Sequence, residues 1–247
     1  MEDPKKDQPV LDEDDFRRVR ESNRQELETT IPKLLKVLIE GLDTCRTLME
    51  EWHYLLLGKI AISIGRVCQD LLNTSEWDAL PGAAWNARNL LELWVWTKYC
   101  CASRVTARRF HEDCLRDSQG LTDSYFKMCD VVGLDRGLEP RMREQIQAVA
   151  CDQLGIESLD AGYERVAKAA ATVGLDNWYL PCNAFLSKFA HPTAFLVVGV
   201  MHQQDESLRE FQAALTTQGV FFAHQCVTAL ADFVLMTPSE PARGAGA

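Results

Sequence analysis

Hydrophobic and polar residues recur along this chain at the three- and four-residue spacing of amphipathic α-helices. This spacing runs through residues 12–30, and Pro32 then suits the first turn of a second helix. A third helix is predicted over residues 52–73, and the segment NTSEWDALPG supplies the break that follows. No alternating strand pattern of useful length occurs. The pattern therefore predicts an all-α fold.

The most apolar segment is WNARNLLELWVWTKYCC at residues 85–101. It is apolar around most of its circumference, which is typical of a helix enclosed by other helices, so we expect it at the centre of a bundle. Glycine and proline residues mark the expected starts and ends of the remaining helices. These patterns cover residues 107–133, the stretch from Pro140 to Gly155, a short helix closed by Gly174, a helix ending before Pro192, and residues 206–236.

Residues 12–237 are predicted to form one helical domain, a single multi-helix bundle. The 247 residues are 47% hydrophobic and 25% charged, as in an ordinary globular protein. Residues 1–11 and the final PSEPARGAGA at 238–247 are polar or rich in small residues, so we expect disordered tails there.

The N-terminal sequence MEDPKKDQPVLDEDDF lacks the apolar stretch of a signal peptide, and charged residues interrupt the strongest apolar runs before they reach about 18 residues. We therefore expect a cytoplasmic protein that has no membrane partner. The nine cysteines are odd in number and scattered, and they form no C-x-x-C pair. Neither a disulfide framework nor a metal site is expected, and no cofactor motif is present.

A formal net charge of −10 opposes broad attraction to nucleic acid backbones. A local basic cluster, Arg104, Arg108 and Arg109, is the main exception. It is interpreted either as a local binding patch or as a solvated helix face, and the solvated face is the commoner case.

Charged residues fall in one stripe of the most apolar helix. Arg88, Glu92 and Tyr99 share a narrow face, with Trp85 beside them. Because burying an arginine or a carboxylate alone is costly, Arg88 and Glu92 should pair. The pair is either a structural ion pair or part of a binding or catalytic site, and loss of Arg88 should be damaging in both cases.

A second polar stripe lies in NAFLSKFAHP, where Asn183, Ser187 and His191 recur every four residues and Lys188 lies close by. The helix C-terminus favours the protonated form of His191, which could then donate a proton or hold an anion. A capping histidine that satisfies terminal carbonyls is the alternative. His224 is expected to be a hydrogen-bonded core residue.

Two short blocks, A-R-N-L-L-E at 87–92 and L-S-K-F-A-H-P at 186–192, resemble a family of prokaryotic helical proteins that looks related to the HEPN superfamily. The resemblance implies a HEPN-like bundle over roughly residues 52–237. Several HEPN families are metal-independent ribonucleases of toxin and antiviral systems, in which a late helix carries an arginine shortly before a histidine. His191 matches the histidine, but the residues where the arginine would stand, Ala184 to Leu186, include none.

Three hypotheses follow. The first is a non-catalytic or regulatory HEPN-like module that binds a nucleotide or a protein partner, in a stress or phage-defence setting. The second is a metal-independent ribonuclease in which His191 and Arg88 act at the scissile phosphate with Glu92 beside them. The third is a small-molecule enzyme in which Arg88 holds an anionic substrate. Asn183, Ser187, Lys188 and Tyr99 are the expected binding residues, and the apolar face of residues 206–236 could also pair two copies as a homodimer.

Overall fold

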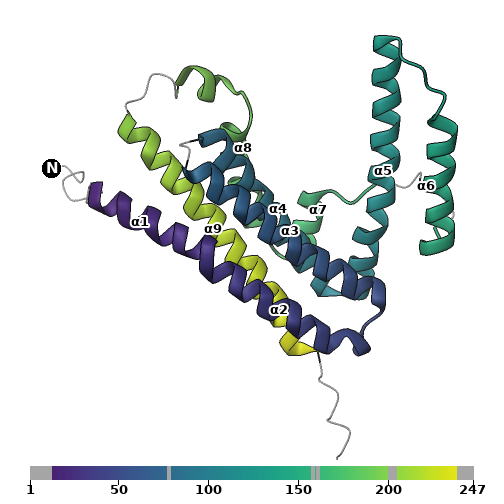
Figure 1. Cartoon of the computed structure of the whole chain (residues 1–247), viewed down its shortest axis with the longest axis horizontal. Helices are drawn as coiled ribbons and strands as arrows, with labels where there is room; N and C mark the ends of the chain where they lie inside the picture. Colours follow the sequence, from purple (N-terminus) through teal and green to yellow (C-terminus); the bar gives the residue numbers. More distant parts are fainter. Residues whose placement is uncertain (1–12, 77–78, 157–158, 160–161, 200–204, 238–247) are drawn as a thin grey trace, which may run out of the picture.

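The protein, seen here as a computed structural model, is described over residues 13–76, 79–156, 159, 162–199 and 205–237. The two predicted tails lie outside these residues. Over the described ranges the chain forms an all-α bundle without strands, as the sequence pattern predicted (Figure 1). The helices are α1 (Glu13–Gln25), α2 (Ile31–Cys45), α3 (Glu51–Glu76), α4 (Leu80–Ala102), α5 (Arg104–Val132), α6 (Glu139–Leu154), α7 (Val166–Thr172), α8 (Asp176–Ala190) and α9 (Asp205–Met236).

The first two helices form one continuous rod, α1 and α2, joined by a π-helical segment at Glu26–Thr30 (Figure 1). The expected boundary before Pro32 is therefore a change of helical pitch and not a break. Pro32 has no backbone N–H and cannot bond to the carbonyl four residues earlier. The wider π turn accommodates this, and the Ile31 N–H donates to the Glu26 carbonyl, five residues back.

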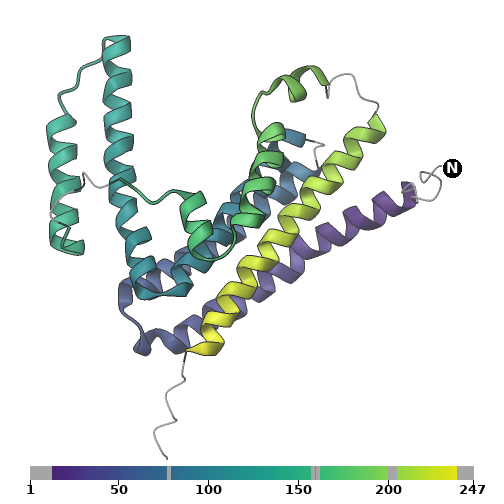
Figure 2. The ribbon, with the colours of Figure 1, turned by 180° about the vertical axis from the view of Figure 1, so that it is seen from behind.

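Helix α4 occupies the centre of the bundle, as predicted, with α9, α8 and α3 packed around it (Figure 2). Its side chains Leu90, Leu91 and Val95 are fully buried. Helices α9, α3 and α4 approach one another closely at Gly219, where a Cβ atom would lie 2.3 Å from Leu71 Cδ2. Only glycine fits this crossing without repacking.

Helix α9 is long and apolar, with a mean hydropathy of 1.5 over an 18-residue stretch within Ser207–Met236. By length and composition it could cross a membrane, contrary to the expectation that no segment reaches that length. A helix in the core of a bundle has the same composition. Here α9 packs against α4, and Leu215, Phe222 and Leu230 are buried in the shared core.

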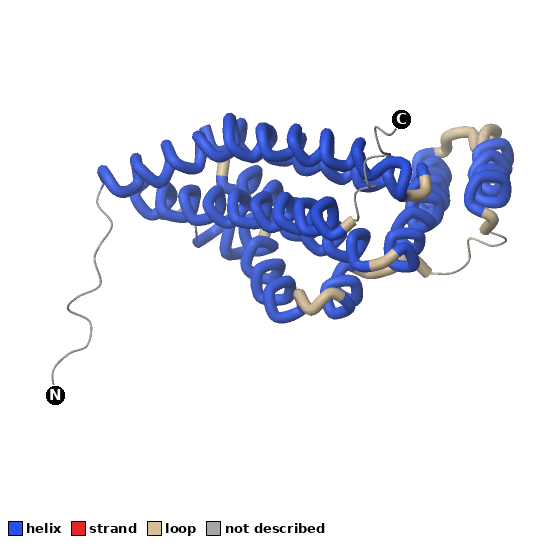
Figure 3. Tube along the Cα trace, turned by 90° about the horizontal axis from the view of Figure 1, so that it is seen from below, coloured by secondary structure: helices blue, strands red, loops and turns tan. Residues whose placement is uncertain are grey.

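The second half of α5 and the antiparallel α6 project from the bundle as an arm, seen at one end of the molecule (Figures 1 and 3). The arm has a small apolar cluster of its own: Ala150, Ile156 and Leu159 are buried there against Leu115 and Ile146. Several apolar side chains of α5 face solvent, among them Leu121, Met128 and Val132. The arm is therefore packed more thinly than the rest of the chain.

Buried His53 joins the start of α3 to the end of α4, since its Nε2 donates to the Cys100 carbonyl at 3.1 Å. Burial lowers the pKa of His53 below its ordinary value of 6.5. The unfolded chain therefore takes up this proton at a higher pH than the native protein does. The stabilisation from neutral His53 is complete above the unfolded pKa and is lost as the pH falls toward the lowered native pKa.

We expect the free energy of unfolding of the wild type to fall more steeply between about pH 7 and pH 5 than that of His53→Gln, which keeps a donor for Cys100. Urea unfolding at a series of pH values measures both slopes. Parallel pH profiles for the two proteins would contradict this role of His53.

Candidate functional site

The two polar stripes predicted on separate helices meet between α4 and α8. Arg88 Nε donates to Asn183 Oδ1 at 2.9 Å, and Arg88 Nη1 lies 2.9 Å from His191 Nε2. Arg88 Nη2 forms the predicted ion pair with Glu92, 3.2 Å from Oε1. Each guanidinium nitrogen therefore has a partner, and the arginine is held in one orientation.

Local sequence positions these groups. Arg88 and Glu92 are one turn apart on α4, and Asn183 is two turns before His191 at the end of α8. The helix ends at Ala190 because Pro192 disfavours helical geometry in the residue before it. His191 is accordingly extended, with φ −116° and ψ 155°.

The contact between Arg88 and His191 orients the imidazole. A guanidinium can only donate, so His191 Nε2 is the acceptor in this hydrogen bond. The ring therefore offers Nδ1 to any further partner. The protonated form of His191 that the helix C-terminus favours stays a prediction.

Trp85 gives the site an exposed aromatic surface. Its side chain is 46% exposed, although it lies on the central helix. Its ring meets the His191 ring edge to face at 5.8 Å between centroids, and the Arg88 guanidinium lies 5.9 Å from the ring centroid. His191 is also exposed, so the guanidinium of Arg88, the imidazole of His191 and the indole of Trp85 lie next to one another at the surface.

Three other predicted binding residues take no part in the hydrogen bonds and ion pair of Arg88. Tyr99 shares the face of Arg88 but lies about 16 Å further along α4, at a rise of 1.5 Å per residue. It is buried, and burial together with the charge of Glu164 raises the pKa of its hydroxyl. Ser187 makes no side-chain hydrogen bond to the described residues, and the Lys188 side chain is exposed.

Sequence reasoning missed Tyr179, which is buried on α8. Burial and the charge of Glu92 raise the pKa of the Tyr179 hydroxyl, and the charge of Arg88 partly opposes this rise. Tyr179 therefore lies close to the Arg88–Glu92 ion pair. The signal was available: Tyr179 precedes Asn183 by four residues and extends the same stripe by one turn.

The three arginines of the basic cluster on α5 already have partners within the protein. Arg104 pairs with Glu50, and Arg108 Nε lies 3.0 Å from Glu112 Oε1. Arg109 donates to the Gly162 carbonyl. Only Arg104 matches the solvated-face interpretation, with 71% of its side chain exposed, whereas the side chains of Arg108 and Arg109 are partly buried.

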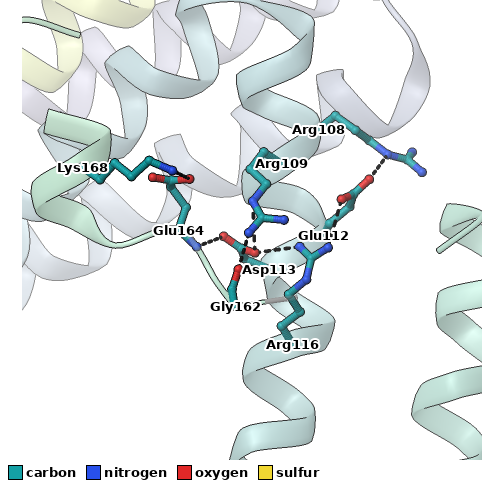
Figure 4. A network of polar contacts seen from close by, with 8 residues as sticks. All are labelled: Arg108, Arg109, Glu112, Asp113, Arg116, Gly162, Glu164 and Lys168. Atoms are coloured by element: carbon teal, nitrogen blue, oxygen red, sulfur yellow. Dashed lines mark hydrogen bonds and ion pairs between the residues drawn. The ribbon is translucent and has the colours of Figure 1, made fainter. Parts of the chain in front are cut away.

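Asp113 is the centre of this network (Figure 4). Its Oδ1 accepts from Arg116 Nη1 at 2.8 Å, and its Oδ2 accepts from the Glu164 backbone N–H at 2.7 Å. Asp113 and the Arg116 side chain are almost completely buried. The network therefore joins α5 to the segment before α7 and has a structural role.

Other titratable groups make local contacts. His224 is hydrogen-bonded, as predicted, to Glu26 Oε2 at 2.9 Å, but its side chain is half-exposed and not in the core. All nine cysteines are free thiols; burial raises the pKa of Cys68 to about 12 and also raises that of Cys182. Within the described ranges, no group of three or more His, Cys, Asp or Glu side chains is placed to hold a metal ion.

Comparisons with protein-family models, with curated proteins and with solved structures found no match to this chain. Its function must therefore be inferred from the site itself.

Proposed function

We propose that this chain is a helical binding module that holds a phosphate of a nucleotide, within single-stranded RNA, on the Arg88–His191 surface. The contact of Arg88 with His191 at 2.9 Å, beside exposed Trp85, is the observation that carries the proposal. Arginine forks match phosphate geometry, and the Nδ1–H of His191 adds a second donor.

Preorganisation supports phosphate binding. Asn183 and Glu92 hold the guanidinium before any ligand arrives, so little side-chain entropy is lost on binding. Glu92 also competes with a phosphate for Nη2 of Arg88, so the affinity for one phosphate is modest. Removing the charge of Glu92 therefore tests the proposal, because it should leave Arg88 Nη2 free for the phosphate.

Trp85 supports a nucleotide ligand in particular. Single-stranded RNA is commonly bound by stacking of its bases on exposed aromatic rings while basic groups contact the backbone. Such stacking contributes about 1–3 kcal/mol per base. Trp85 and Arg88 are close enough together to act on one nucleotide.

Metal-independent RNA cleavage is a second candidate, which the same 2.9 Å contact favours. An Arg88 that shares a phosphate with His191 would take the place of the arginine that HEPN nucleases carry before their histidine. His191 would then act as general acid or contact the phosphate. The resemblance to HEPN proteins is part of this proposal and has no support beyond the two sequence blocks.

A small-molecule enzyme is less well supported. Two cavities, one between α1, α3 and α9 and the other between α8 and α9, are lined by neither Arg88 nor His191. The Arg88–His191 contact lies instead at the exposed edge of the bundle.

Arg88→Ala is expected to weaken binding of a fluorescent single-stranded RNA about tenfold or more, because a charge-assisted contact is lost. Glu92→Gln should strengthen binding, since the competing carboxylate is removed. Fluorescence anisotropy in the presence of a chelator measures both, and gel analysis of the same samples reports cleavage. Cleavage by the wild type that His191→Ala abolishes would select the ribonuclease candidate.

Lys98→Ala is the matched control, because Lys98 is an exposed cation on α4 that lies about 15 Å along the helix axis from Arg88. It should leave RNA affinity unchanged. Circular dichroism must show that all variants are folded. Equal RNA affinity for wild type and folded Arg88→Ala would refute the proposal.

A further inference from the structure

A cavity of about 660 Å³ lies between α1, the end of α3 and the first half of α9, and it contains none of the residues of the Arg88–His191 surface. Cavities of about 300–1,000 Å³ are typical of sites for small molecules. Its walls include Arg17, Arg20 and Arg209 together with a single carboxylate, Glu13. The cavity is therefore basic in a chain whose formal net charge is −10.

The arginines can exchange their present partners for a ligand. Arg17 pairs with Asp14 at 2.8 Å and Arg209 with Glu13 at 3.3 Å, and the side chains of both pairs are more than half exposed. Exposed ion pairs of this kind are only weakly stabilising, because water screens both charges. Arg20 has no ion-pair partner among the residues that the structure describes. An anionic group that entered the cavity would meet cations from two helices.

The inner wall is polar and sheltered. Buried Asn23 donates from Nδ2 to Thr217 Oγ1 at 2.9 Å, and buried Gln212 donates from Nε2 to the Thr74 carbonyl at 3.2 Å. The Oε1 atom of Gln212 is buried and has no hydrogen-bond donor in the described part of the chain. Leaving such an acceptor unpaired is energetically unfavourable. Since Gln212 lines the cavity, its unpaired Oε1 is the acceptor that a ligand hydroxyl would meet there.

The remaining wall is apolar. Phe16 of α1 lines the cavity and is half-buried. An aromatic side chain beside basic groups suits a ligand that has both a planar ring and a charged group. Together these walls fit the parts of a nucleotide: the basic groups match its phosphates, the buried acceptor matches a hydroxyl group, and the aromatic ring matches its base.

We propose that this cavity is a second site that binds a free nucleoside phosphate. Arg17, Arg20 and Arg209 contact the phosphates, Gln212 accepts from a ribose hydroxyl, and Phe16 packs on the base. This site is independent of the RNA surface at Arg88, and neither proposal requires the other.

Isothermal titration calorimetry on the full chain, at fixed ionic strength, tests the site with ATP, AMP, ribose 5-phosphate and inorganic phosphate as probes. We expect saturable binding of ATP, weaker binding of AMP, and weaker binding still of ribose 5-phosphate and inorganic phosphate. No saturable binding of ATP or AMP would overturn the proposal. Inorganic phosphate that binds as tightly as AMP would overturn the assignment to a nucleotide.

The double variant Arg20→Gln/Arg209→Gln should weaken ATP binding by at least about tenfold, because charge-assisted hydrogen bonds are lost. Arg18→Gln is the matched control: Arg18 is an exposed arginine of the same helix, pairs with Asp15, and does not line the cavity. An equal loss in Arg18→Gln and the double variant would show non-specific attraction and refute the site. ATP binding that persists in Arg88→Ala is expected, and its loss there would assign the nucleotide to the other surface.

Discussion

Asp113→Ala is expected to lower the free energy of unfolding by about 3–5 kcal/mol, the usual cost of removing one partner of a buried ion pair. The substitution leaves the buried Arg116 guanidinium with Glu112 alone, at 3.4 Å. It also leaves the backbone N–H of buried Glu164 without its acceptor. Urea unfolding followed by circular dichroism measures the change.

Asp117→Ala is the control for this prediction. Asp117 is an exposed acid one turn further along α5, and partial desolvation together with the charge of Asp113 raises its pKa. Its removal relieves a repulsion and should leave stability unchanged or slightly higher. A loss below about 1 kcal/mol in Asp113→Ala would place its network among weakly stabilising surface pairs.

Trp94→Ala should be similarly damaging, with an expected loss of about 3–5 kcal/mol. Trp94 lies on the central helix, is 5% exposed and contacts the rings of Trp178, Phe221 and Phe222 at 6.1 to 6.2 Å between centroids. Its removal opens a cavity at the point where α4, α8 and α9 meet. Thermal and urea unfolding both report the loss.

Trp178 belongs to the same ring cluster but is 50% exposed. Trp178→Ala should therefore cost less than half as much as Trp94→Ala, because less apolar surface returns to water. Equal losses in the two variants would mean that burial does not determine the contribution of each ring.

Most of the fold could be predicted because its signals are local. Gly133, Gly155 and Gly174 end or follow helices with positive φ, and Pro192 ends α8 as its geometry requires. The π turn before Pro32 could not be predicted, because the sequence shows only that one backbone donor is missing and not how the helix adapts. The projecting arm could not be predicted either, since the apolar spacing of α5 is the same whether its face meets a core or solvent.

The candidate site was predictable in its parts. The Arg88–Glu92 pair follows from i, i+4 spacing, whereas the contact of Arg88 with His191 joins residues 103 positions apart. Tyr99 was grouped with Arg88 because a helical wheel shows angle and ignores distance along the axis. The cavity between α1 and α9 left no sequence signal, since its walls meet only through tertiary packing.

The central place of α4 also has a consequence for biosynthesis. The helix is complete at Ala102, but α9, which covers it most extensively, begins only at Asp205. At about 5–20 residues per second, the ribosome needs roughly 5–20 s to make the intervening chain. During that time the central helix of the nascent protein has no cover from α9, so its apolar side chains stay open to aggregation or to chaperone binding until translation reaches the end of the bundle.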